Sequence, residues 1–439
     1  MGTFVECVAR RLNEPAVCRL SDGADWRAGA APARAWHAAA PVPVLLADED
    51  PMTMATRAAV ALAAGRDVFL GNPRWTTAER AAAEAIVRLD PPAAEPAAPS
   101  GGRVMLATGG SGGALRFAIH TPETLAWAAE AFRAHFGFRA VHSLCLLPLH
   151  HVSGFQQLVR ALVTNGTLLL GDWPAIAAGI RPARPAGSWV LSLVPAQLQR
   201  LIGDAESCVW LRGFAAIFLG GAPAGPELLE RARIAALPLA PAYGATETAA
   251  QCAAQTPAEF AAGLPGLRLF SQTTVSILDL DTGEPLPAAH SGRLEISAAA
   301  LFHGYWPAPR DAGPWQTDDL GFLDTAGRLH VVGRVDAAIN TGGEKVQPGE
   351  VEAALRATGA LSDVVVLGVP DERWGECVAA FFPAADAPDP ARIAVSLRTH
   401  LSPHKIPRRW IPVADWPRNE QGKVSRAALR RLAADASSR

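Results

Sequence analysis

Short apolar runs alternate with amphipathic segments over the first part of the chain. The runs 42–47 (VPVLLA) and 67–70 (DVFL) predict strands, and the segment 54–64 between them predicts a helix. Strands that alternate with helices usually form parallel sheets covered by helices, so this region predicts an α/β layout. The Pro/Ala-rich stretch 91–100 (PPAAEPAAPS) then predicts a linker.

The same alternation resumes beyond this stretch. Thr121 is a suitable N-cap for a helix, and Pro122 suits the first helical position. The predicted strands are 104–107, 144–147, 168–170, 189–194 and 215–219, and the predicted helices are 121–136, 154–163 and 196–202.

The pattern changes from residue 273 onwards. Short alternating runs at 274–277, 292–296 and 329–332 predict antiparallel strands. After Gly333-Arg334 the segments 351–357, 364–369 and 391–401 predict a helix, a strand and a second helix of a separate unit. We therefore expect an α/β protein. Its large N-terminal domain, 1–334, would hold α/β sheets and a small β subdomain, and its smaller α+β C-terminal domain would span 335–439.

Composition excludes several function classes. The 439 residues are 49% hydrophobic and 19% charged, which fits a globular chain, and the net charge of −2 argues against nucleic-acid binding. The six cysteines lie far apart without metal-ligand or redox spacing, which favours a reducing, cytoplasmic setting. We expect neither a signal peptide nor a transmembrane segment, because no apolar run has the length and flanks of either.

A glycine-rich segment, TGGSGG, follows the predicted strand 104–107 and precedes the helix cap at Thr121. A turn of this kind turns backbone N–H groups toward an anion, and Arg116 adds a positive charge suited to phosphate. It lacks the GxxxxGK[ST] pattern of a P-loop. Taken alone, the segment is equally well explained as a flexible connection.

Two further segments carry polar side chains next to predicted strands. In YGATET, Tyr243 would stack on a base and Glu247 would hold Mg²⁺ with phosphate oxygens. In TDDLGFLD, Asp319 would accept hydrogen bonds from ribose hydroxyls. A packed tyrosine with a solvated glutamate, and a simple acidic turn, are the alternatives.

One further segment lies at the predicted domain boundary, and the last lies near the end of the C-terminal domain. Arg334 in VGRVD suits ribose or phosphate, Asp336 is a hinge candidate, and the Gly-Gly turn in NTGGE allows close backbone approach to a ligand. A loop and a capped helix would also explain this region. Lys423 in RNEQGKVSR, considered alone, is a solvated lysine in a polar turn. The order of all five segments along the chain is the stronger signal.

These segments resemble the signatures of the acyl-adenylate-forming superfamily of acyl-CoA synthetases, adenylation domains and luciferases. The matching stretches are TGGSGGALRF, YGATE, TDDLG, GRVD, TGGEKVQPGEVE and NEQGKVSR. Within that superfamily the chain is most similar to 2-succinylbenzoate–CoA ligases of the cyanobacterial type. The supporting stretches include FLGNPRW, LPLHHVSGFQQLVRAL, SLVPAQLQRLI, FLGGAPAGPELLERAR and HKIPRRWIPV.

The resemblance implies a set of roles for individual residues. Residues implied in ATP or AMP binding are Thr108, Gly109, Gly110, Ser111, Gly112, Arg116, Gly220, Gly221, Ala222, Tyr243, Gly244, Asp319 and Arg334. Residues implied in binding the acid are His151, Ser153, Arg160 and Gln251. Lys423, His151, Thr246 and Glu247 are the implied catalytic residues, with Glu247 also the metal ligand, Asp336 the hinge, and Gly342 and Gly343 the CoA channel.

The implied activity is ATP-dependent formation of an acyl-AMP and then of an acyl-CoA thioester, with Mg²⁺ and CoA, in quinone biosynthesis. A ligase for another acid, or an adenylation enzyme that loads a carrier protein, fits the same signatures. Relatives are often homodimers. The chain departs from the family pattern at three positions, where Ala114 replaces a common lysine, Ala337 a second acidic hinge residue and Gln251 a threonine of the acid pocket.

Overall fold

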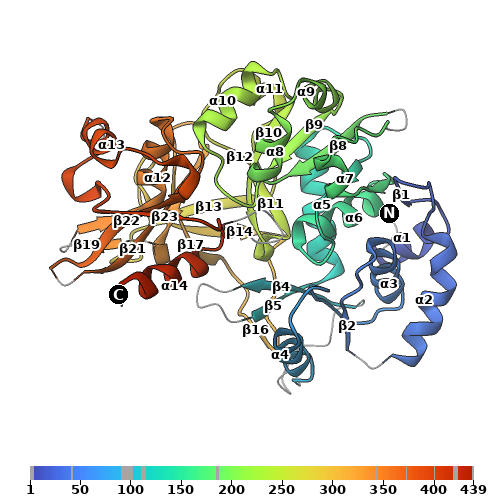
Figure 1. The fold of residues 1–439 in the computed structure, drawn as a ribbon. Coiled ribbons are helices and arrows are strands. Elements are labelled where there is room, and N and C mark those ends of the chain that lie inside the picture. Colours follow the sequence, from blue (N-terminus) through green and yellow to red (C-terminus); the bar gives the residue numbers. More distant parts are fainter. Residues whose placement is uncertain are drawn as a thin grey trace.

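The computed structural model describes most of the chain in ten stretches. They are 4–40, 43–89, 102–109, 115–183, 187–337, 339–341, 344–371, 373–399, 401–418 and 424–437. The fold is mixed α/β, with a large N-terminal part and a smaller C-terminal part (Figure 1). The predicted linker 91–100 lies outside the described residues.

An eight-stranded sheet forms the centre of the N-terminal part. In spatial order its strands are β1 (Val17–Arg19), β7 (Leu168–Leu170), β6 (His142–Cys145), β8 (Trp189–Leu193), β9 (Ala216–Leu219), β10 (Leu239–Ala245), β11 (Ala250–Ala254) and β12 (Arg268–Leu269). The strands from β1 to β10 are parallel, and β11 and β12 are antiparallel. Every residue of β7, β8 and β9 is buried, as expected for strands covered on both faces.

Alternate side chains of this sheet enter two cores. Phe218 and Val190 pack with Phe132 of α5 (Pro122–Phe136) on one face. Leu191 and Ile217 pack on the other face with α8 (Pro195–Leu201), α9 (Ala205–Arg212) and α10 (Pro226–Ile234). Thr121 caps α5 as predicted, since its hydroxyl accepts a hydrogen bond from the Thr124 amide at 3.3 Å.

A six-stranded sheet lies beside the first. Its strands, in order, are β16 (Ala308–Pro309), β15 (Gly304–Tyr305), β5 (Leu115–His120), β4 (Val104–Gly109), β3 (Val68–Leu70) and β2 (Val44–Leu46). The predicted strand–helix–strand unit is present as β2, α3 (Pro51–Ala63) and β3. Strand β5 was missed. The glycine-rich segment therefore lies within a β4–β5 hairpin, rather than between a strand and a helix.

The N-terminal part contains six further helices in the described stretches. They are α1 (Phe4–Arg11), α2 (Arg27–Ala39), α4 (Thr77–Val87), α6 (Val152–Val163), α7 (Trp173–Ala177) and α11 (Pro257–Ala261). Side chains of α1, α3 and α6 share one buried core. The first 40 residues thus complete this core and, through β1, the edge of the eight-stranded sheet.

The antiparallel strands predicted after residue 273 form a third sheet. Its order is β13 (Thr273–Leu278), β14 (Gly292–Ala298), β17 (Trp315–Leu323) and β18 (Leu329–Arg334). Side chains of Val275, Ile277, Leu294 and Ile296 alternate into a core that also contains Cys252 and Ala253 of β11. This sheet is therefore packed against the end of the eight-stranded sheet.

The C-terminal part has its own sheet and cores. Strands β20 (Glu344–Val346), β19 (Ile339–Thr341), β22 (Gly375–Pro383) and β21 (Val365–Asp371) lie in that order, and β23 (Arg409–Val413) pairs with β22. Helices α12 (Pro348–Ala357) and α13 (Pro390–Leu397) pack on one face and α14 (Arg426–Ser437) on the other. Helix α12 also contacts α10 and β18, which joins this part to the rest of the molecule.

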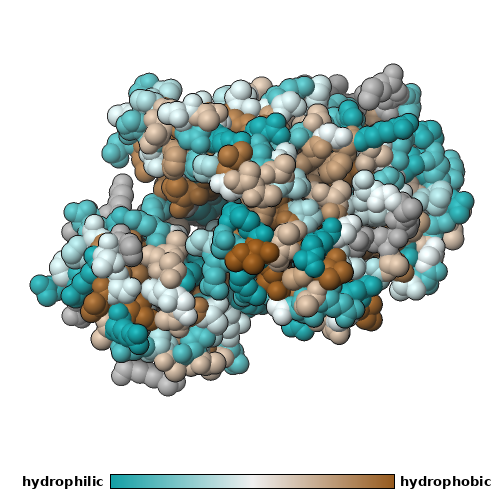
Figure 2. All heavy atoms as spheres, turned by 90° about the horizontal axis from the view of Figure 1, so that it is seen from above, coloured by the Kyte–Doolittle hydropathy of each residue, from teal (hydrophilic) through white to brown (hydrophobic). Residues whose placement is uncertain are grey.

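Seen from above, the surface is mostly polar, with a deep hollow on the left half of the molecule bordered by polar and apolar side chains (Figure 2). None of the helices in the described stretches is long and apolar enough to cross a membrane.

Candidate active site

The YGATE segment forms a tight connection between β10 and β11. A bulge interrupts their pairing between Tyr243 and Gly244, and Thr246–Thr248 form a single 3-10 turn. A Cβ atom at Gly244 would lie 1.9 Å from the carbonyl oxygen of Ala250, so only glycine fits there. The Thr248 hydroxyl accepts from the Ala245 amide at 2.9 Å and donates to the Ala250 carbonyl at 2.6 Å. These contacts fix the direction of the neighbouring side chains.

Tyr243 joins two of the predicted segments. Its hydroxyl donates a hydrogen bond to Oδ2 of Asp319 at 2.6 Å, although the residues are 76 positions apart. Asp319 lies opposite Arg334 in the β17–β18 pairing, and Arg334 donates to Oδ1 at 3.3 Å. Burial and the Asp319 charge raise the pKa of Tyr243, which keeps its phenol protonated as a donor. The three residues assigned to adenine and ribose therefore form one connected group.

The GGA segment directly follows β9 and lies beside β10. A Cβ atom at Gly220 would be 3.3 Å from the Ala242 carbonyl oxygen, and Gly221 has a φ of +80°. Because β9 and β10 are neighbouring parallel strands, Ala222 and the two glycines lie at the same sheet edge as Tyr243. A nucleotide base commonly binds at such an edge.

Glu247 is connected to the base of the glycine-rich hairpin through Tyr305. The Tyr305 hydroxyl donates to Oε1 of Glu247 at 2.6 Å, and the Arg116 guanidinium carbon lies 4.1 Å from the centre of the Tyr305 ring. Arg116 is directly opposite Thr108 in the β4–β5 hairpin. The residues predicted to bind phosphate and Mg²⁺ are therefore brought together by a tyrosine that the sequence interpretation did not include.

A buried histidine, His120, also contacts the 3-10 turn Thr246–Thr248. His120, which is fully buried, lies 2.8 Å through Nε2 from the Thr246 carbonyl oxygen and 3.1 Å through Nδ1 from the Thr124 hydroxyl. Burial lowers the pKa of His120 to about 4, so the ring is neutral near neutral pH. A neutral ring that donates from Nε2 fixes Thr246 without adding charge.

The chemistry of Glu247 fits a hard divalent cation. The residue is only 7% exposed, and the hydrogen bond from Tyr305 uses part of the accepting capacity of its carboxylate. Thr246 adds a hydroxyl to the same turn. Within the described stretches, no group of three or more His, Cys, Asp or Glu side chains could hold a metal ion, so phosphate oxygens and water would have to complete the coordination.

Arg160 and Gln251 meet at the position predicted to bind the acid. Arg160 is 2% exposed, its guanidinium donates to Oε1 of Gln251, and its guanidinium carbon lies 3.6 Å from the centre of the Phe132 ring. Burial lowers the pKa of Arg160 to about 9, which still leaves it charged at neutral pH. In the described part of the chain no carboxylate forms an ion pair with Arg160, and its Nε has no hydrogen-bond partner. Among the described residues, Arg160 is therefore a buried cation without an anionic partner.

His151 and Ser153 begin the helix that carries Arg160. His151 is the N-cap of α6, without a side-chain capping hydrogen bond, and its ring lies 4.2 Å from the ring of His150. The Ser153 carbonyl accepts from the Gln157 side chain at 3.0 Å. The helix begins earlier than the predicted range 154–163, so that it includes Ser153, about two turns before Arg160.

Several predicted site residues lie outside the described stretches, namely Gly110, Ser111, Gly112, Gly342, Gly343 and Lys423. The backbone of Asp336 lies in a 3-10 turn, Val335–Ala337, directly after β18.

A surface cavity of about 480 Å³ is separate from the site and is lined by residues such as Arg212, Arg233 and Phe260.

Sequence reasoning missed Tyr305, His120 and Phe132. Tyr305 is one of only two tyrosines, and the other had already been noted, so its rarity was an available signal. His120 and Phe132 gave no such signal, because a histidine before a helix cap and a phenylalanine in a helix are both ordinary.

Comparison with known proteins gives the family. Residues 27–306 match the AMP-binding enzyme family, and residues 350–423 match the C-terminal domain of AMP-binding enzymes. The 2-succinylbenzoate–CoA ligase of Geobacillus kaustophilus is 30% identical over 344 residues, which covers 74% of this chain and 68% of the relative. The corresponding ligase of Bacillus velezensis is 30% identical over 298 residues, covering 66% and 60%. The chain belongs to the AMP-binding enzyme family.

Solved structures share the fold over nearly the whole chain. The o-succinylbenzoate CoA synthetase MenE from Bacillus subtilis, in complex with its acyl-adenylate OSB-AMP, has a TM-score of 0.80 at 21% identity and covers 98% of both chains. ATP-bound MatB from Rhodopseudomonas palustris has a TM-score of 0.82 at 22% identity and covers 99% of both chains. The fold is therefore that of adenylate-forming enzymes, with a large N-terminal and a smaller C-terminal domain.

Proposed function

We propose that this member of the AMP-binding enzyme family is an AMP-forming acid–CoA ligase, and that its acid is 2-succinylbenzoate, in menaquinone biosynthesis. The observation that carries the proposal is the hydrogen-bonded group of Tyr243, Asp319 and Arg334, which come from three separate segments. Glu247 lies in the turn directly after the strand that carries Tyr243. The named relatives are 2-succinylbenzoate–CoA ligases, which supports the choice of acid.

The nucleotide would bind at the edge of the eight-stranded sheet. Gly220, Gly221 and Ala222 would border the adenine together with Tyr243. The two oxygens of Asp319 already accept from Tyr243 and Arg334, and each retains a lone pair for a ribose hydroxyl. Tyr243 and Arg334 would therefore hold the Asp319 carboxylate in a fixed orientation for the ribose.

The phosphates would lie between the glycine-rich hairpin and the Glu247 turn. Thr108, Ser111 and the neighbouring glycines would donate to phosphate oxygens, and Arg116 would offset their charge. Glu247 and Thr246 would hold Mg²⁺, which when bound neutralises charge that develops on the phosphates. Tyr305 would fix the Glu247 carboxylate, and His120 would fix the backbone at Thr246.

The reaction would proceed in two steps. First, a carboxylate oxygen attacks the α-phosphorus of ATP, forming the acyl–phosphate bond and releasing pyrophosphate. Lys423 would align the carboxylate and the α-phosphate, because both groups are negative and repel one another. Then the CoA thiol attacks the acyl carbon, and AMP leaves as the thioester bond forms and the thiol proton is released. Rotation about Asp336 would exchange Lys423 for the Gly342–Gly343 segment between the steps.

The acid would be recognised through Arg160. Burial of a cation is costly when none of its described neighbours is an anion, and a second carboxylate on the substrate would supply one. Gln251 would then either release Arg160 or share it with the carboxylate. Ser153 would bind that second carboxylate together with Arg160, and His151, the N-cap of α6, would line the pocket near the reacting carboxylate. A dicarboxylic aryl acid such as 2-succinylbenzoate meets these requirements.

The cytoplasm would supply ATP and CoA, and the six cysteines are unpaired, as expected in a reducing compartment. A homodimer also stays a prediction.

The proposal is tested by pyrophosphate release from purified protein with ATP, Mg²⁺ and a panel of acids, with and without CoA. The panel contains 2-succinylbenzoate, benzoate, fatty acids and amino acids. CoA-dependent turnover with 2-succinylbenzoate alone is the expected result. Turnover with a different acid would overturn the choice of substrate, and adenylation without CoA turnover would indicate a carrier protein as the acceptor.

A further inference from the structure

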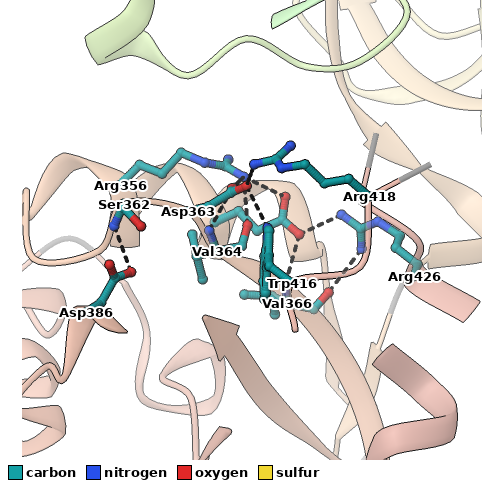
Figure 3. Close-up of polar contacts among 10 residues, drawn as sticks. Arg356, Ser362, Asp363, Val364, Val366, Asp386, Trp416, Arg418 and Arg426 are labelled. Atoms are coloured by element: carbon teal, nitrogen blue, oxygen red, sulfur yellow. Dashed lines mark hydrogen bonds and ion pairs between the residues drawn. The ribbon is translucent and has the colours of Figure 1, made fainter. Parts of the chain in front are cut away.

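Two acidic side chains of the C-terminal part hold the residues on either side of positions 419–423. The first is Glu352 of α12, which is 4% exposed. Its Oε1 accepts from the Arg426 guanidinium at 2.5 Å and from the Val366 amide at 2.9 Å. Arg426 also donates to the Val366 carbonyl at 3.1 Å (Figure 3). Arg426 is the first residue of α14, so Glu352 fixes the chain directly after these positions.

The second acidic side chain is Asp363, which fixes the chain directly before them. Its Oδ2 accepts from the Trp416 indole at 2.9 Å and also from the Arg418 guanidinium (Figure 3). Its Oδ1 accepts from the Val364 amide at 2.8 Å. Asp363 therefore binds two side chains of the segment that leads into position 419.

The two flanks are also joined to each other. Arg418 and Val424 form an antiparallel bridge, and the Ser425 amide donates to the Pro417 carbonyl at 2.8 Å. The four-residue spacing of Glu352 and Arg356 on α12 brings a second guanidinium to the network, 3.7 Å from Glu352 and 4.0 Å from Asp363. One helix of the C-terminal part thus connects both anchor points.

This network would be unusually extensive if it only closed a surface loop. Exposed ion pairs contribute little to stability. Here, however, the buried Glu352 pairs with Arg426 after positions 419–423, and the half-buried Asp363 pairs with Arg418 before them. Lys423 stands one residue before Val424. Since a lysine side chain is long and flexible, the position of its backbone decides which atoms its ammonium group can reach.

We propose that Glu352 and Asp363 are positioning residues for the adenylation step, acting through Arg426 and Arg418 on the segment that carries Lys423. This inference rests on the proposed function, in which Lys423 aligns the carboxylate and the α-phosphate. Neither acidic residue touches the substrates. They would hold the backbone on both sides of the segment that carries Lys423. The rate of thioester formation would not depend on them, because that step does not use Lys423.

The test compares Asp363→Asn, Glu352→Gln and Arg418→Gln with the wild-type enzyme in two separate assays. Adenylation is followed as pyrophosphate release, and thioester formation is followed from supplied acyl-AMP and CoA. We expect adenylation to fall roughly tenfold or more, and thioester formation to change by less than about threefold. Glu350→Gln is the matched control, because Glu350 lies on the same helix and pairs with Lys405 at 2.7 Å instead. It should leave both steps unchanged.

Limited trypsin digestion gives a readout that does not depend on activity. Cleavage after Lys423 should be faster in Asp363→Asn and Arg418→Gln than in wild type and Glu350→Gln. Arg418 is 40% exposed, so its replacement is expected to fold even where Glu352→Gln does not. Arg418→Lys should restore part of the adenylation rate.

Two results would overturn the inference, namely unchanged adenylation in folded variants or an equal fall in both steps. Absence of adenylation in the wild-type enzyme, or full adenylation by Lys423→Ala, would instead overturn the proposed function.

Discussion

The guanidinium of Arg160 donates to the side-chain oxygen of Gln251, 91 positions away, and rests on the ring of Phe132. The resemblance implies that Gln251 stands where the family pattern has a threonine. Gln251, which departs from the family pattern, therefore contacts Arg160, the cation that is proposed to select the acid. A neutral amide partner leaves the charge of Arg160 available to a substrate carboxylate.

Replacement Arg160→Met removes this charge while it fills most of the same volume. We expect KM for 2-succinylbenzoate to rise about 30-fold, since a charge-assisted pair contributes about 2 kcal/mol, and KM for a monocarboxylic acid to change little. Thermal unfolding should show no loss of stability, because a well-packed apolar side chain replaces a buried charge. Equal changes in KM for both acids would contradict the assignment.

Replacement Lys423→Ala separates the two chemical steps. Adenylation should fall by about 100-fold or more, because the two negative reactants lose their common positive partner. Thioester formation from supplied acyl-AMP should be retained. Rapid-quench measurements give the rate of each step separately. Loss of both steps would show that Lys423 has another role.

Replacement Tyr305→Phe removes the hydroxyl that donates to Glu247 and keeps the ring beneath Arg116. A hydrogen bond to a charged group contributes about 1.5–3 kcal/mol, so kcat/KM for ATP should fall roughly tenfold or more. The Mg²⁺ concentration for half-maximal rate should rise as well. Tyr305→Leu, which also removes the aromatic ring, should lower kcat/KM for ATP further. An unchanged Mg²⁺ dependence in both variants would argue against a role for Tyr305 at Glu247.

Replacement Asp319→Asn tests the proposed ribose contact. The amide keeps the size of the carboxylate, but it weakens the pairing with Arg334 and the hydrogen bond from Tyr243. KM for ATP should rise about tenfold, with KM for the acid nearly unchanged. Tyr243→Phe should have a smaller effect in the same direction. If KM for the acid rose instead, Asp319 would belong to a different part of the site.

Acid should destabilise the protein through three histidines that are buried or half-buried. Burial lowers the pKa values of His120, His135 and His150 to about 4 each, below the ordinary value of about 6.5. Between these values the unfolded chain binds protons that the folded chain does not, so the free energy of unfolding falls as the pH falls. The limiting slope is about 1.4 kcal/mol per pH unit for each histidine.

The variant His120→Gln should lose less stability than wild type between about pH 7.5 and pH 5.5, by about 1 kcal/mol. Urea denaturation at the two pH values measures this difference. An identical pH dependence in both proteins would mean that His120 does not bind its proton differently in the folded and unfolded states.

The sequence alone determined the most apolar strands, the antiparallel strands after residue 273 and the segments that carry polar side chains, but it did not reveal β5. The runs that became β7, β8 and β9 are so apolar that only a fully buried sheet accommodates them, and the alternating runs after residue 273 suit only half-covered antiparallel strands. Local chemistry also determined the Thr121 cap and the glycine at position 244. These features depend on neighbours within a few residues of the chain.

Tertiary structure decided which distant side chains meet. The β4–β5 hairpin places Arg116 opposite Thr108 and against Tyr305, and the crossing of α5, α6 and β11 brings Phe132, Arg160 and Gln251 together. Hydrophobic patterning specifies the face of each element that is buried. It does not specify which polar atoms lie opposite one another across elements, because hydrogen-bond partners depend on register and packing over the whole fold.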